Sequence, residues 1–156
     1  MKKILLVVSF LIATIFSTQA QDLNVIPYST DIGQLPDGWH KFTLQGATFD
    51  VEVASGNLVK GNIIWFDGSK YSGNLAGSVI SGRGTYTWPD GTRYEGSFKN
   101  NQRHGKGSMI LLDNSKWSGK WKNNKKNGKG KQFDTEGEIV QQGVWESDEY
   151  VGAKKR

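Results

Sequence analysis

The chain has no cysteine, only three prolines and only one long apolar run. An exported chain without cysteine cannot use disulfides to hold a small core together. The apolar run, Ile4–Phe16, follows a short basic start and is too short to span a bilayer as a stable anchor. Small residues at Thr18 and Ala20 then suit signal peptidase. We therefore expect residues 1–20 to form a signal helix cleaved after Ala20, with an uncleaved N-terminal anchor as the alternative.

Composition also argues against helices in the rest of the chain. Each glycine inside a helix costs about 1 kcal/mol relative to alanine, and the chain has twenty glycines. Its six tryptophans are too many for a disordered linker. No second long apolar run follows the first. We expect one β domain, without a transmembrane span, in the periplasm or outside the cell.

One stretch of the chain has almost no acidic residues, and the stretch after it has no basic ones. From residue 93 to 131 there are eleven Lys and Arg against two acids, whereas from 132 to 152 there are six acids and no Lys or Arg. The chain closes on a basic tail, residues 153–156. The basic stretch suggests an anionic partner, and the alternative is a solvated face that keeps the sheet from aggregating.

A pattern recurs every 23 residues. Aromatic-x-Gly begins at Tyr71, Tyr94 and Trp117, and a Gly-x-Gly begins at Gly82, Gly105 and Gly128. An Asp-Gly type turn keeps the same step. A lone phosphate-binding loop would not repeat, and a glycine follows the lysine where such a loop needs Ser or Thr. The Gly-x-Gly segments are therefore structural parts of a repeat rather than a nucleotide-binding site.

Each unit fits a β-hairpin. In "YEGSF" the side chains of Tyr94, Gly96 and Phe98 share one face, because side chains alternate along a strand. Glycine beside large rings predicts that the rings of one hairpin lie over the bare backbone of its neighbour. One hairpin is marginal in water, so neighbours must stack. Phe133 breaks the alternation without an explanation from sequence.

The structural positions of this pattern are the recurring aromatics and glycines. They are Tyr71, Gly73, Gly82, Gly84, Gly91, Tyr94, Gly96, Phe98, Gly105, Gly107, Trp117, Gly119, Trp121, Gly128, Gly130 and Gly137.

The unit resembles the MORN repeat. The best match is "YEGSFKNNQRHGKGSMILLDNSK", residues 94–116, with further units at about 71–93 and 117–140 and partial units at both ends. The resemblance covers residues 61–152. It implies an elongated, twisted single-layer antiparallel sheet of successive hairpins, and it implies membrane attachment, anionic phospholipid binding, self-association or scaffolding rather than catalysis. Upstream we expect a linker at 21–37 and a capping hairpin at 38–60.

No catalytic, cofactor or metal site is predicted. His40 and His104 have no second histidine or cysteine at ligand spacing. Asp134, Glu136 and Glu138 alternate like part of a calcium loop but lack the rest of its spacing. Asp67, Asp90 and Asp113 are expected to be structural turn residues. An enzyme is therefore not expected.

Two functions remain from the sequence. The first is a scaffold that binds a protein partner, or itself, through exposed aromatics such as Trp65, Trp88 and Trp145. The second is electrostatic binding of anionic phospholipid or another polyanion, whereas nucleic acid is not expected. The candidate patch for an anionic partner consists of Lys99, Arg103, Lys106, Lys120, Lys122, Lys125, Lys126 and Lys129.

Overall fold

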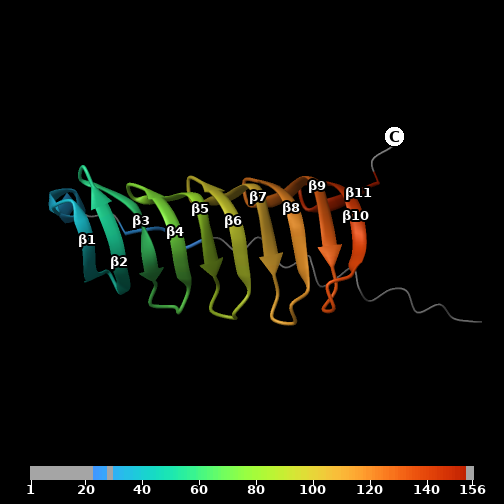
Figure 1. The fold of residues 1–156 in the computed structure, drawn as a ribbon, viewed down its shortest axis with the longest axis horizontal. Helices are drawn as coiled ribbons and strands as arrows, with labels where there is room; N and C mark the ends of the chain where they lie inside the picture. Colours follow the sequence, from blue (N-terminus) through green and yellow to red (C-terminus); the bar gives the residue numbers. More distant parts are fainter. Residues whose placement is uncertain (1–22, 28–29, 154–156) are drawn as a thin grey trace, which may run out of the picture.

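The computed structural model describes residues 23–27 and 30–153. The predicted signal helix, residues 1–20, lies outside this range. The described residues form one antiparallel sheet of eleven strands in which the order across the sheet is the order along the chain (Figure 1). After a short 3-10 helix, η1 (Thr30–Gln34), the strands are β1 (Gly38–Leu44), β2 (Ala47–Ala54), β3 (Asn57–Ile64), β4 (Lys70–Ala76), β5 (Val79–Thr87), β6 (Arg93–Lys99), β7 (Gln102–Ile110), β8 (Lys116–Lys122), β9 (Lys125–Phe133), β10 (Ile139–Glu146) and β11 (Glu149–Gly152).

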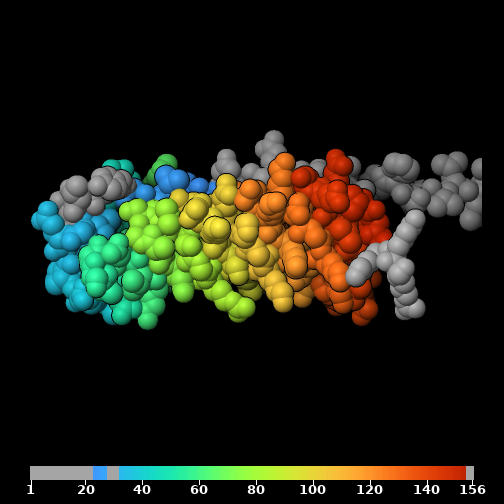
Figure 2. All heavy atoms as spheres, turned by 90° about the horizontal axis from the view of Figure 1, so that it is seen from above, coloured from blue at the N-terminus to red at the C-terminus, as the bar shows by residue number. Residues whose placement is uncertain are grey.

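The sheet is a single elongated layer, as predicted. Seen from above, the colours run in chain order from one end of the molecule to the other (Figure 2). Each strand therefore pairs only with the strands before and after it. Stability in such an array comes from contacts between neighbouring units rather than from one central core.

Tight turns close the hairpins of the array. Asn100 and Asn101 have φ of 49° and 60°, and Asn123 and Asn124 have φ of 50° and 67°. Two successive residues with positive φ are typical of the type I′ turn, whose twist matches that of the flanking strands. Asparagine tolerates this conformation better than most residues. The Asn-Asn pairs thus fix the register of β6–β7 and β8–β9.

Longer turns join one hairpin to the next. The carboxylates of Asp67, Asp90 and Asp113 each accept a hydrogen bond from the backbone N–H two residues later, at 2.9 Å. Gly91 follows Asp90 with φ of +86°, and Gly137 has φ of +90° in the equivalent turn between β9 and β10. The predicted structural role of the three aspartates is confirmed.

Within the repeat units the core contains aromatic rings that lie on glycine, whereas toward the N-terminal end it also contains buried aliphatic side chains such as Val51, Leu58 and Ile63. A Cβ added at each of three glycines would meet first the atoms of a single ring: Tyr71 at Gly84, Tyr94 at Gly107 and Trp117 at Gly130. All three rings are at most 1% exposed. Glycine here provides room for a ring, so apolar area is buried without a second layer.

Ring and glycine belong to the same hairpin, so the predicted placement on the neighbouring hairpin is wrong in this detail. Tyr94 pairs with Met109, and Gly107 occupies the diagonal position two residues along the partner strand. The phenol leans along its strand onto that diagonal position. The neighbouring hairpin reaches the same glycine differently, because the indole Nε1 of Trp121 donates a hydrogen bond to the Gly107 carbonyl at 3.0 Å.

Edge-to-face contacts between rings join successive hairpins. The ring of Tyr71 meets Phe98 of the next hairpin at 5.6 Å, and Tyr94 meets Trp121 at 5.3 Å. Trp117 and Trp145 repeat the arrangement at 5.3 Å. Each such pair contributes about 0.5–1.5 kcal/mol beyond its buried area. The ring of one unit is therefore covered by the next.

The two glycines of each Gly-x-Gly are needed for different reasons. Gly82, Gly105 and Gly128 have φ of +96°, +78° and +107°, a conformation that favours glycine. The second glycines, which carry the rings, do not have positive φ. They are required by space alone, as the ring contacts indicate.

A bulge after the central glycine of the first strand gives each tyrosine a hydrogen-bond partner. The register shifts between Gly96 and Phe98, and the Tyr94 hydroxyl donates to the Ser97 carbonyl there at 3.0 Å. In the third unit Trp117 replaces the tyrosine, and its buried Nε1 has no partner among the described residues. The larger indole buries more apolar surface than a phenol ring but lacks the hydrogen bond that the tyrosine hydroxyl makes.

The segment predicted to be a linker, residues 21–37, is packed on the sheet where the structure describes it. Leu23, Ile26 and Ile32 are 7%, 5% and 7% exposed and belong to the hydrophobic core. The Trp65 indole donates a hydrogen bond to the Val25 carbonyl at 3.1 Å. Isolated apolar residues without a period carry no sequence signal, because their burial depends on a surface formed elsewhere.

Phe133 lies on the face opposite the rings, which accounts for its parity. It pairs with Lys116, whose ammonium lies 4.7 Å from the centre of the Phe133 ring. Gln132 takes the position opposite Trp117 instead.

Candidate functional site

The face of the sheet opposite the rings is polar and carries two rows of side chains. Strand register aligns Arg83 with Ser97 and Lys106 with Lys120. Lys129 follows on β9, next to the Gly119–Gly130 pair. We call Arg83, Lys106, Lys120 and Lys129 the basic row, and all four side chains are exposed.

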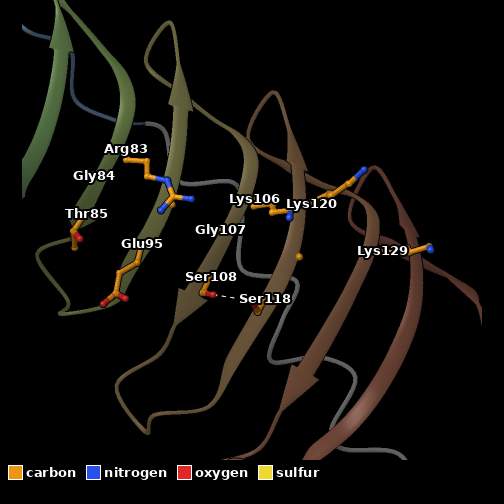
Figure 3. Close-up of a pocket in the computed structure, with 12 residues that line it drawn as sticks. Arg83, Gly84, Thr85, Glu95, Lys106, Gly107, Ser108, Ser118, Lys120 and Lys129 are labelled. Atoms are coloured by element: carbon orange, nitrogen blue, oxygen red, sulfur yellow. Dashed lines mark hydrogen bonds between the residues drawn. The ribbon is translucent and has the colours of Figure 1, made fainter.

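A second row runs beside the first. Register pairs Thr85 with Glu95, and Ser108 with Ser118. The Ser108 hydroxyl donates a hydrogen bond to the Ser118 hydroxyl at 2.8 Å. We call Thr85, Ser108 and Ser118 the hydroxyl row. Figure 3 shows the hydroxyl row beside the basic row on β5, β7 and β8, with Glu95 of β6 between Thr85 and Ser108.

Between the two rows lies an open groove of about 750 Å³, with glycine backbone along its floor. We call it the basic groove. Its lining residues are Arg83, Gly84, Thr85, Glu95, Gly96, Lys106, Gly107, Ser108, Ser118, Gly119, Lys120 and Lys129. A second hollow of about 610 Å³ shares Ser118 and Lys129 with it and continues to β10. Together they run along the long axis of the sheet.

The basic row forms no ion pair with any acid that the structure describes. Among the described residues, the Lys60–Glu52 pair, at 2.9 Å, and the Arg93–Glu95 pair, at 2.8 Å, both involve other cations. Glu95, the one acid of the basic groove, is thus engaged by Arg93. Four cations therefore face solvent in one line and are available to an anionic ligand.

The structure brings together only part of the predicted patch. Lys106, Lys120 and Lys129 lie in the basic groove. Lys99, Lys122 and Lys125 are exposed at the hairpin turns, where Lys122 pairs with Lys125. Arg103 and Lys126 lie on the opposite face, among the rings, and their assignment to the patch is wrong.

Arg103 is 3% exposed and lies between two indoles. Its guanidinium carbon is 4.8 Å from the Trp121 ring centre and 5.6 Å from that of Trp88. Its Nη2 donates to the Asn124 carbonyl at 2.9 Å, and its backbone N–H donates to the Asn124 side-chain oxygen at 2.8 Å. A planar, weakly hydrated guanidinium suits such a stacked position. Arg103 therefore joins two hairpins rather than facing a ligand.

Lys126 occupies the equivalent place in the following unit. It is 7% exposed, with its ammonium 5.5 Å from the Trp117 ring centre. Burial lowers the pKa of Lys126, nearby Asp148 acts in the opposite direction, and Arg103 adds to the lowering. Its position, like that of Arg103, serves packing between units.

Arg83 is the cation of the basic groove that the sequence interpretation missed. It is the middle residue of the first Gly-x-Gly, and Lys106 and Lys129 hold the same place in the next two. Basic side chains at residues 83, 106 and 129 therefore repeat with the period of the hairpins. This periodicity was the available signal, because it places all three cations on one face.

The aromatics expected to be exposed are buried. Trp65, Trp88 and Trp145 are 5%, 5% and 3% exposed. The Trp65 and Trp88 rings both pack against Tyr86, with ring centres 5.6 Å and 4.9 Å apart. They are therefore part of the core and offer no docking surface, because in a one-layer sheet the rings themselves make the interior.

The described residues contain no cluster of three or more His, Cys, Asp or Glu placed to hold a metal ion. His104 lies in β7, and the His40 ring Nε2 is 2.7 Å from the Pro36 carbonyl. Within the same residues, no helix has the length and apolar character needed to span a bilayer. Charge and open backbone, rather than reactive groups, are what this face offers.

Comparison with known proteins agrees with the geometry. Residues 71–93, 94–115 and 117–137 match the family model of the MORN repeat. These three stretches begin at the successive rings Tyr71, Tyr94 and Trp117. None of the curated proteins matches the chain. MORN repeats are generally interaction or membrane-binding modules and are typically non-catalytic. The chain is a MORN repeat-containing protein.

Proposed function

We propose that the protein is a non-catalytic interaction module that binds an anionic partner through the basic groove. The observation that carries this proposal is the alignment of four exposed cations, without acidic partners, across strands β5 to β9. Complementary charge steers a partner to such a surface and fixes its position there.

The polar face is favoured over the ring face because the rings are already buried by one another. A protein partner on the ring face would need aromatic anchors, and Trp65, Trp88 and Trp145 are not free to supply them. An anionic protein remains a possible occupant of the basic groove, alongside lipid headgroups and other polyanions.

Charge alone gives this site a modest affinity. A basic side chain near an anionic surface contributes about 1 kcal/mol, so the basic row contributes about 4 kcal/mol. That free energy corresponds to a dissociation constant of about 1 mM. A small anion would therefore bind weakly, and a ligand with many linked anionic groups is required for stable attachment.

Two matched triple variants test the proposal. Lys106, Lys120 and Lys129 are changed to Ser in the first, and Lys99, Lys122 and Lys125 to Ser in the second. Both lose three positive charges from exposed positions. Elution from immobilised heparin and co-sedimentation with vesicles containing phosphatidylserine measure binding.

We expect the groove variant to elute at clearly lower salt and to lose most vesicle binding, and the turn variant to change little. Equal effects of the two variants would show that net charge, rather than the basic groove, determines binding. Lys126 is left unchanged because it is buried, and its removal would confound binding with stability.

We also propose that the protein is exported and that cleavage after Ala20 leaves Gln21 as the first residue. The basic start and the apolar run of the N-terminal twenty residues support this. N-terminal sequencing of the protein purified from its native envelope tests it, and an intact Met1 would refute cleavage.

A further inference from the structure

The basic groove has a spacing that a ligand can match. Neighbouring strands lie about 4.8 Å apart. Lys106, Lys120 and Lys129 come from three successive strands, and Arg83 lies two strands before Lys106. The basic row is therefore roughly 19 Å long, with a cation at every strand except β6. Such a line fits a linear chain that carries negative charges at short, regular intervals.

The groove is open along its length. The second hollow shares two lining residues with the first and leads on to Lys131 and Gln142. A chain bound there can enter and leave at the ends, so the site can hold the interior of a polymer.

The lining of the basic groove contains no apolar side chain, and Phe133 and Ala153 line only the second hollow. Protein interfaces have an apolar, well-packed centre that supplies most of the binding energy. An acyl chain would likewise need apolar walls. The basic groove instead has hydroxyl groups along the side facing the cations, where Glu95, which is paired with Arg93, is the one carboxylate between them (Figure 3). Serine and threonine hydroxyls both donate and accept hydrogen bonds, which suits a ligand that itself carries many hydroxyls.

Resting on the proposed function, we propose that the ligand of the basic groove is a linear acidic polysaccharide that lies across the strands. Its acidic groups meet the basic row, and its sugar hydroxyls meet Thr85, Ser108 and Ser118. The glycine floor allows the sugar rings to lie close to the backbone.

A length series of oligogalacturonates tests this inference, with calorimetry on the mature chain at low salt. We expect affinity to rise with length until the oligomer spans the roughly 19 Å of the basic row, and to change much less beyond it. A dimer that binds as tightly as a long oligomer would overturn the inference.

A gain-of-binding variant tests the alignment itself. Ser97 is the uncharged position of the row on β6, and Lys120 occupies the same place of the next repeat, so Ser97→Lys fits the fold. Gln102→Lys adds the same charge at the exposed first residue of β7, next to the hairpin turn. We expect about fivefold tighter oligogalacturonate binding for Ser97→Lys, which corresponds to one added cation, and little change for Gln102→Lys. An equal gain for both would contradict a row.

Two further probes separate the ligand classes. Polyglutamate of matched charge and vesicles containing phosphatidylserine are measured on the same protein and on the Lys106, Lys120 and Lys129 to Ser variant. Tighter binding of either probe than of oligogalacturonate would refute the polysaccharide. If that variant still lost binding to the preferred probe, the proposed function would stand without this inference. If it kept binding to every probe, the proposed function itself would fail.

Discussion

Replacing Gly107 by alanine tests whether the core depends on rings seated on bare backbone. A Cβ at Gly107 would overlap the outer half of the Tyr94 ring, namely its Oη, Cζ and Cε2 atoms. The backbone there does not have positive φ, so alanine adds no conformational strain. Overpacking costs about 1–3 kcal/mol. Displacing the ring also weakens its contacts with Phe98 and Trp121, 5.0 Å and 5.3 Å away, at about 0.5–1.5 kcal/mol each.

We therefore expect Gly107→Ala to lower the free energy of unfolding by about 2–6 kcal/mol, measured by urea denaturation with tryptophan fluorescence. The matched control is Gly33→Ala. A Cβ at Gly33 would find its nearest neighbour 3.9 Å away, and its φ is not in the positive region. That change should be neutral or stabilise by up to about 1 kcal/mol, because alanine reduces the entropy of the unfolded chain.

A double-mutant cycle decides the cause. Leucine at residue 94 lacks the Oη, Cζ and Cε2 atoms that the new Cβ would meet. In the Tyr94→Leu background, Gly107→Ala should therefore lower the free energy of unfolding by less than about 1 kcal/mol. Additive costs would show that the ring is not the obstacle and would refute the proposed basis of the core.

Two more predictions follow from the same contacts. Burial raises the pKa of both Tyr71 and Tyr94, so above pH 10 the unfolded chain loses these protons while the folded chain keeps them. The free energy of unfolding should then fall as pH rises, by up to about 1.4 kcal/mol per pH unit for each tyrosine. Urea midpoints measured from pH 8 to 11.5 should fall less steeply for Tyr94→Phe than for the unchanged protein. The same slope for both would contradict a raised pKa of Tyr94. Asn124→Gly keeps the positive φ but removes the acceptor for the Arg103 backbone N–H, so it should lower the free energy of unfolding in urea by about 1–3 kcal/mol. Asn123→Gly, one residue earlier in the turn, should lower it little. Equal losses would show that Asn124 does not link the two hairpins.

Much of the fold could be predicted because each hairpin repeats the same local solution. The 23-residue step, the ring-x-Gly strands and the Asp-Gly type turns agree with one another, and the structure has the hairpins where the units were expected. Consistency between turn chemistry and alternation is strong support for a fold. The packing of residues 23–27 could not be predicted in this way, because Leu23 and Ile26 are buried in a hydrophobic cluster whose other members lie farther along the chain.

The basic groove could be predicted only in part, because the net charge of a stretch does not tell on which face of the sheet each side chain lies. Arg103 has the parity of Gly105 and Gly107, which puts it among the rings, whereas Lys106 has the opposite parity. Charged side chains are rarely buried, and that expectation outweighed the alternation. The cation–π contacts and hydrogen bonds that make Arg103 tolerable at 3% exposure come from other hairpins, so they have no local signature.

The one-dimensional order of the strands determines how the molecule should respond to a pulling force. A strand in the middle of the sheet cannot leave before its neighbours do, so tension on the two ends should peel hairpins away one after another, starting from an end. Residues 23–27 fasten the turn after β3 through the Trp65 indole, and β5 through the Tyr86 hydroxyl. The four-residue β11 instead lies at the edge of the sheet, where the Tyr150 hydroxyl donates a hydrogen bond to the Gln142 carbonyl of β10 at 3.1 Å. We expect forced unfolding to begin at β11 and to proceed in steps of one hairpin. The protein would then extend gradually under tension between two attachment points at its ends.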